Sequence, residues 1–131
     1  SANIVAQEQQ ASQGIEVTVS VDAALLPLVK ADDVLFVAIR DVKGGPPFAA
    51  KRLPISVIKQ GKASIRLSDL DAMMPERTLQ SARSDKIKLA VVARVSHSGT
   101  ASAESGDLSG NPVVVSAEQT QVNIEINQQI P

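Results

Sequence analysis

Strict alternation of apolar and polar residues over short stretches is the feature that most limits the fold of this chain. In residues 15–21, four aliphatic side chains at odd positions alternate with Glu16, Thr18 and Ser20. The same period of two recurs in residues 62–67, 87–95 and 122–126. Because successive side chains of a β-strand point to opposite faces of a sheet, each of these stretches predicts a half-buried strand. No strong helical period competes with them.

The order of strand and turn signals predicts one all-β domain over residues 15–131. Seven or eight short strands separated by turns are typical of an antiparallel β-sandwich. The near-continuous apolar run 33–41 predicts a central strand covered on both faces, and Pro54 predicts an edge or a bulge. Residues 1–14 are polar and predict a flexible leader or linker. Only 2% of the chain is aromatic, so aliphatic side chains must form the core.

Charge and composition exclude several classes of function. The chain has 13 basic and 14 acidic residues, a net charge of −1, which gives no electrostatic basis for binding nucleic acid or an anionic membrane. It has no cysteine, which excludes disulfides, thiolate metal sites and covalent haem attachment. No apolar run approaches the roughly 20 residues of a membrane span. Residues 1–13 lack a basic start, so we expect no signal peptide there.

Few residues are candidates for catalysis. His97 is the single histidine and follows the longest predicted strand. Nothing beside it in the sequence suggests an orienting carboxylate or a nucleophile turn, so we expect an exposed histidine without a function. Asp69 and Asp71 are interpreted as turn and cap residues. We therefore expect no enzymatic activity and no cofactor.

The adjacent methionines Met73 and Met74 allow two interpretations. Thioethers and imidazole suit copper, so these residues and His97 are an alternative Cu(I) site, although the cysteine of a blue-copper centre is missing. Alternatively the methionines fill gaps in the core. Neighbouring residues of an extended strand cannot both point inward. We expect one buried and one partly exposed methionine.

Four motifs in a fixed order carry a resemblance to a known family. They are GGPPFAAKRLP (44–54), LDAMMP (70–75), KLAVVARVSHSGTA (88–101) and SGDLSG (105–110). Together they resemble the C-terminal periplasmic domain of the CycH/CcmI-type cytochrome c biogenesis proteins, and the match runs from about Ile15 to Pro131. None of the matching residues is catalytic in that family.

The resemblance implies a periplasmic location and a parent protein anchored in the bacterial inner membrane. It also implies work with the haem lyase machinery, in which apocytochrome c is held while haem is attached. The expected partners are apocytochrome c and haem lyase subunits, with no nucleic acid and no direct membrane contact. This chain is then a non-catalytic interaction module, and an inert Ig-like spacer is a further alternative to the copper site.

The candidate contact surface comprises the GGPPF loop (44–48), the basic pair Lys51 and Arg52 in the predicted strand that follows it, and the AMMPER segment (72–77). The basic pair is interpreted either as a solvated face or as a docking patch for an acidic partner. The candidate partner-binding residues are Pro46, Pro47, Phe48, Lys51, Arg52, Met73, Met74, Glu76 and Arg77.

Overall fold

The computed structural model of the chain describes residues 14–116 and 118–131. The predicted leader lies almost wholly outside the described residues. The described strands are β1 (Ile15–Val21), β2 (Val34–Asp41), β3 (Ala49–Pro54), β4 (Lys62–Leu67), β5 (Leu89–Ser96), β6 (Leu108–Ser109), β7 (Val113–Val115), β8 (Gln121–Ile126) and β9 (Gln128–Gln129). One α-helix, α2 (Leu79–Ser84), and three single-turn 3-10 helices, η1 (Leu26–Leu28), η2 (Ile55–Val57) and η3 (Asp69–Asp71), lie in the connections.

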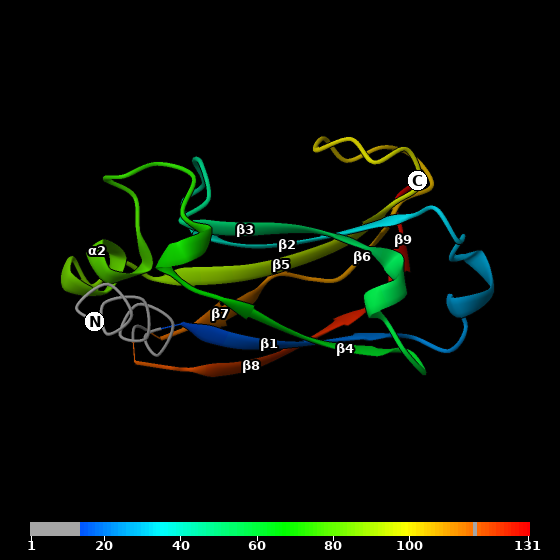
Figure 1. The fold of residues 1–131 in the computed structure, drawn as a ribbon, viewed down its shortest axis with the longest axis horizontal. Coiled ribbons are helices and arrows are strands. Elements are labelled where there is room, and N and C mark those ends of the chain that lie inside the picture. Colours follow the sequence, from blue (N-terminus) through cyan, green and yellow to red (C-terminus); the bar gives the residue numbers. More distant parts are fainter. Residues whose placement is uncertain (1–13, 117) are drawn as a thin grey trace, which may run out of the picture.

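The strands form two sheets that pack face to face (Figure 1). The smaller sheet has the order β4-β1-β8, and the larger has the order β3-β2-β5-β6-β9, with β7 also paired to β5. The predicted all-β sandwich is therefore confirmed. The nine strands of the described residues exceed the expected seven or eight because β6 and β9 are two-residue pairings.

One pairing departs from the expected antiparallel arrangement. Strands β1 and β8 run parallel, with Val17 opposite Val122 and Val19 opposite Ile124. Parallel neighbours need a long crossover connection rather than a hairpin. Here everything from β2 to β7 lies between the two strands in the sequence, so local turn signals could not reveal the pairing.

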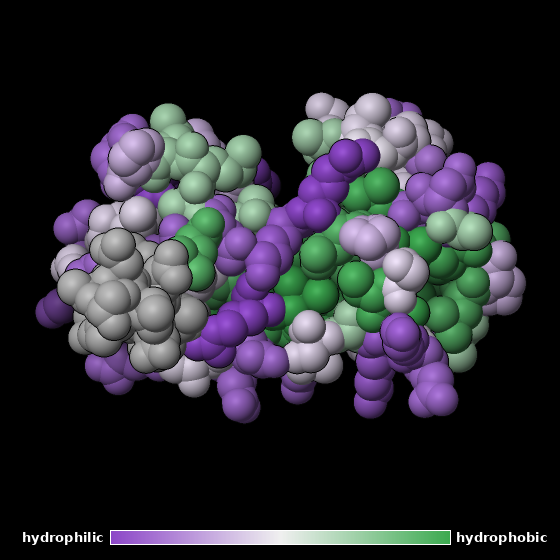
Figure 2. All heavy atoms as spheres, in the orientation of Figure 1, coloured by the Kyte–Doolittle hydropathy of each residue, from purple (hydrophilic) through white to green (hydrophobic). Residues whose placement is uncertain are grey.

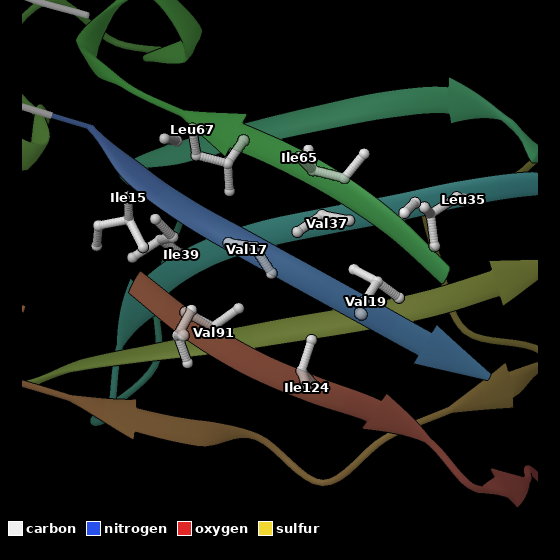
Figure 3. Close-up of a cluster of buried hydrophobic side chains, with 14 of the residues drawn as sticks. Ile15, Val17, Val19, Leu35, Val37, Ile39, Ile65, Leu67, Val91 and Ile124 are labelled. Carbon is white, nitrogen blue, oxygen red and sulfur yellow. The ribbon is translucent and has the colours of Figure 1, made fainter. Parts of the chain in front are cut away.

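The core lies between the sheets and is almost entirely aliphatic. In β1 the odd-numbered residues are buried, and Ile15, Val17 and Val19 have no exposed surface. Figure 3 shows these side chains pointing toward Leu35, Val37 and Ile39 of the opposite sheet. The alternation seen in the sequence thus places one face of each sheet in the core.

Strand β2 is central in the larger sheet, between β3 and β5, as predicted. However, only one face is buried. Leu35, Val37 and Ile39 point into the core, whereas Phe36 and Ala38 are half-buried on the outer face. The expectation of cover on both faces is wrong, since an apolar run does not distinguish buried side chains from apolar side chains on an open sheet face.

Proline and aspartate positions behave as their chemistry predicts. Pro54 ends β3, an edge strand of the larger sheet, where a missing N–H costs no ladder bond. Asp22 accepts a hydrogen bond from the amide of Ala24 (3.0 Å) in the turn before η1.

The sequence pattern does not predict the short helix α2. Thr78 caps this helix, and Leu79 and Ala82 anchor it in the core.

Candidate functional site

The structure brings the two predicted contact loops together. We call residues 68–78 the methionine loop and residues 42–48 the GGPP loop. The Arg77 guanidinium donates a hydrogen bond to the Pro46 carbonyl (2.8 Å) and lies 4.4 Å from the centre of the Phe48 ring. Arg77 therefore joins two segments about 30 residues apart. Phe48 itself is 2% exposed, so it belongs to the core beneath the loops.

Hydrogen bonds fix both ends of the methionine loop. Ser68 and Asp71 form a capping box around η3. The Asp69 carboxylate accepts hydrogen bonds from the amides of Leu79 (2.6 Å) and Gln80 (3.3 Å) at the start of α2. The predicted turn and cap roles of Asp69 and Asp71 are confirmed. The loop is thus held where it leaves the sheet and where it enters the helix.

The tip of the methionine loop presents apolar side chains to solvent. Leu70 is 57% exposed, Met73 66% and Met74 38%. The expectation of one buried methionine is wrong, because the aliphatic strands already fill the core and the loop projects away from the sheets (Figure 1). In Figure 2 the projecting loop appears as a pale green group at the upper left. Glu76 is also exposed, beside Pro75.

The basic pair does not form one patch. Lys51 faces the sandwich edge, where its Nζ donates to the Arg66 carbonyl (2.7 Å) and lies 3.8 Å from Asp71. Arg52 lies on the outer face of the larger sheet and donates to the Gly99 carbonyl (3.0 Å). Neighbouring residues of a strand point to opposite faces, and this alternation separates the two charges. Lys51 links the two sheets, and only Arg52 lies on the outer face.

The proposed copper ligands do not converge. The methionine loop contacts the GGPP loop, which follows Asp41 at the end of β2, and Asp41 is paired with Leu89 at the start of β5. His97 comes after the far end of β5. A strand of eight residues spans roughly 25 Å, so His97 and the methionines lie at opposite ends of the sandwich. Within residues 14–116 and 118–131, no three His, Cys, Asp or Glu side chains group as metal ligands.

His97 is half-buried rather than exposed and has a carboxylate partner. Its Nδ1 lies 2.9 Å from Asp33 Oδ1, and the Asp33 side chain has no exposed surface. Asp33 also accepts a hydrogen bond from the Lys30 amide (2.7 Å). This orienting carboxylate lies 64 residues away in the sequence, so no local signal could have revealed it. The pair ties the end of β5 to the turn before β2.

A second buried carboxylate organises the 97–107 loop. Asp107, 1% exposed, accepts hydrogen bonds from Arg94 Nη1 (2.8 Å) and from the amides of Glu104 (3.0 Å) and His97 (3.3 Å). Burial alone raises the pKa of Asp107. The hydrogen bonds from the two amides and from Arg94 outweigh burial and hold this pKa below its ordinary value of 3.8.

No helix in the described part of the chain is long and apolar enough to cross a membrane. A family model and a related sequence agree with each other. Residues 15–127 match the family described as the cytochrome c-type biogenesis protein H Ig-like domain. Over 94 residues the chain is 44% identical to the cytochrome c-type biogenesis protein CycH of Pseudomonas aeruginosa. That match covers 70% of the chain and 21% of the relative, so the chain spans about a fifth of the relative's length.

A solved structure resembles this fold. It is an alternative pilotin from the type II secretion system of Vibrio cholerae, with a TM-score of 0.56 and 13% identity. The superposition covers 87% of this chain and 94% of the pilotin chain. At such low identity the similarity concerns the fold alone, and it supports the two-sheet architecture.

Proposed function

Because the chain belongs to the family of the Ig-like domain of cytochrome c-type biogenesis protein H, we propose that it is an interaction module that helps to hold apocytochrome c and to deliver it to the haem lyase machinery. The family supports a role in cytochrome c maturation. Its name denotes assembly rather than a reaction, which is consistent with a non-enzymatic domain. The direct partners in this proposal are apocytochrome c and haem lyase subunits.

The exposed apolar tip of the methionine loop is the observation that carries this proposal. Leu70, Met73 and Met74 are exposed together on a loop whose ends are fixed by hydrogen bonds. An unfolded polypeptide presents varied apolar side chains, and the flexible, polarisable methionine adapts to many shapes. A rigid base under such side chains lowers the entropy lost on binding. The proposed contact surface is thus the methionine loop with Pro46 and Pro47, framed by Glu76 and Arg77.

The proposal also includes a location. The family resemblance implies that haem is attached to the thiols of apocytochrome c outside the cytoplasm. We therefore propose that this domain lies in the periplasm. Its parent protein is then anchored in the bacterial inner membrane by a segment other than this domain.

We expect replacing Met73 and Met74 with serine to weaken binding of reduced, unfolded apocytochrome c by at least about fivefold. Since both side chains are exposed, the free energy of unfolding should change by no more than about 1 kcal/mol for the pair. A methionine in the core would instead cost roughly 2–5 kcal/mol on truncation. The measurements are an NMR titration of the labelled chain and urea unfolding of each variant.

Val114 provides the matched control. It is 53% exposed and apolar, and it lies on β7, which belongs to neither contact loop. Val114→Ser should leave the affinity for apocytochrome c unchanged. Equal effects of Val114→Ser and the methionine variant would indicate non-specific adhesion. No amide shifts in the wild-type chain at high apocytochrome concentration would reject the holding role and favour an inert spacer.

A further inference from the structure

A shallow trough crosses the outer face of the larger sheet. Its floor consists of the small residues Ala38 of β2, Val92 of β5 and Gly110 after β6, and its volume is about 370 Å³. Ala50 of β3 continues the row, since it is the partner of Ala38 in the ladder. We call this row the outer trough. The methionine loop and the 97–107 loop rise at the two ends of this face (Figure 1), and the outline of the molecule is hollowed between them (Figure 2).

Larger side chains border the outer trough on both sides. One border is the cross-strand row Arg52, Phe36 and Arg94, in which Phe36 is opposite both arginines. The Phe36 ring lies 4.8 Å from the Arg94 guanidinium and 5.7 Å from that of Arg52. The other border contains Arg40. Phe36 and Arg40 are four residues apart on one strand, so the borders are roughly 13 Å apart.

The borders carry unbalanced positive charge. Arg94 is paired with Asp107 at 2.8 Å. Arg40 and Arg52 instead donate to backbone carbonyls, of Gly45 (3.4 Å) and Gly99 (3.0 Å). Neither forms an ion pair with a carboxylate within residues 14–116 and 118–131. An occupant of the outer trough therefore gains by carrying acidic groups along both sides.

The floor limits the conformation of the occupant. Over this stretch the backbone groups of β2 are used in the ladders to β3 and β5, and the floor side chains are apolar. An occupant finds few backbone partners there and must satisfy its own polar groups. A helix does so, and its diameter of about 10–12 Å fits between the borders. The row crosses four strands, roughly 14 Å, which corresponds to about nine helical residues.

We propose that the outer trough is a docking site for a short amphipathic helix of a partner polypeptide, with small apolar residues on one face and glutamate or aspartate on its flanks. Arg40 and Arg52 pair with carboxylates on opposite flanks, and Phe36 contacts the apolar face. The outer trough shares no residue with the methionine loop, so this site is separate from the function proposed above and can fail independently of it.

The test uses two synthetic helical peptides that differ only in charge. One has alanine and leucine on one face and glutamate on the flanks; the other has lysine for each glutamate. Titrated into the labelled chain, the glutamate peptide is expected to shift the amides of Ala38, Val92 and Gly110, and the lysine peptide is not. We expect Arg40→Glu and Arg52→Glu each to weaken binding by at least about fivefold.

Ala38→Leu tests the shape of the outer trough without changing its charge. The larger side chain fills the space over the floor, so the glutamate peptide should no longer shift the amides. Lys62→Glu is the control, since exposed Lys62 lies on β4 of the other sheet, and it should bind like the wild type. Thermal unfolding of every variant shows whether the fold is intact. The proposal is overturned if both peptides bind with equal affinity, or if the Ala38→Leu variant binds the glutamate peptide as the wild type does. It is also overturned if anionic lipid vesicles shift these amides and the glutamate peptide does not.

Discussion

Replacing Asp107 with alanine is expected to lower the free energy of unfolding by about 3 kcal/mol, one of the largest effects of any single substitution in this chain. The carboxylate is 1% exposed and accepts three hydrogen bonds, one of them from the Arg94 guanidinium. Removing it leaves two amide N–H groups without an acceptor and the largely buried Arg94 guanidinium without its counter-ion, although Arg94 Nη2 still donates to the carbonyls of Thr100 and Ala101. Unpaired buried charges and donors are costly because water cannot replace the lost partner.

The control for Asp107 is Glu104, an acidic residue of the same loop. Glu104 is exposed, and its carboxylate accepts hydrogen bonds from Ser98 (3.0 Å) and Thr100 (2.6 Å). We expect Glu104→Ala to cost no more than about 1 kcal/mol. Urea unfolding at neutral pH compares the two variants. If Asp107→Ala lowered the free energy of unfolding by as little as Glu104→Ala, water would replace the hydrogen bonds to Asp107 with little loss of stability.

The same carboxylate makes stability depend on pH. Its folded pKa lies below the ordinary value of 3.8, so Asp107 stabilises the fold at any pH above that value. The contribution is lost as the pH falls through the folded pKa, because the folded state must then take up a proton. Asp107→Asn cannot titrate and should show a shallower loss of stability below pH 4 than the wild type. Urea unfolding at a series of pH values measures this difference. If the stability of the wild type and of Asp107→Asn fell equally with pH, Asp107 would not be the source of the pH dependence.

The strands could be predicted from the sequence because their signal is local. A period of two over six to eight residues identifies the buried face of β1, β4, β5 and β8 without knowledge of their neighbours. The parallel pairing of β1 and β8 depends on contacts across most of the chain, and no local pattern encodes it. Helix α2 has only six residues, too few to show a helical period.

The candidate site was predicted only in outline. The sequence motifs indicate the two loops as candidate contact segments, but their meeting depends on Arg77 reaching Pro46, which is 31 residues away. Exposure of both methionines depends on a core that is already full, a property of the whole packing. The outer trough has no signature in the sequence either. Its alanines look like ordinary strand residues, and only the strand register places Ala38 beside Ala50 and Val92.

Gly110→Ala is expected to lower the free energy of unfolding by about 3 kcal/mol, as much as the loss of Asp107, because an added methyl group has no room. A Cβ atom at this position would lie 2.1 Å from the Glu125 carbonyl oxygen and 3.0 Å from its carbon. Both atoms are backbone of β8 in the smaller sheet, so no side-chain rotation relieves the clash. The chain after β6 and strand β8 must separate, and close-packed interiors resist such a shift.

Gly44→Ala distinguishes lack of space from lack of conformational freedom. Gly44 has φ +100° and no atom within 4 Å of an added Cβ, so its substitution strains only the backbone, at about 1 kcal/mol. For a domain of this size, 3 kcal/mol corresponds to a Tm lowered by roughly 10 °C, and 1 kcal/mol to roughly 4 °C. Calorimetry of both variants measures the difference.

Gly110 also forms part of the outer trough floor. A shifted backbone at Gly110 should therefore change which amides shift when the glutamate peptide binds. If instead Gly110→Ala unfolds like Gly44→Ala, the two sheets can separate at this corner without loss, and the rigid floor on which the docked helix depends does not exist.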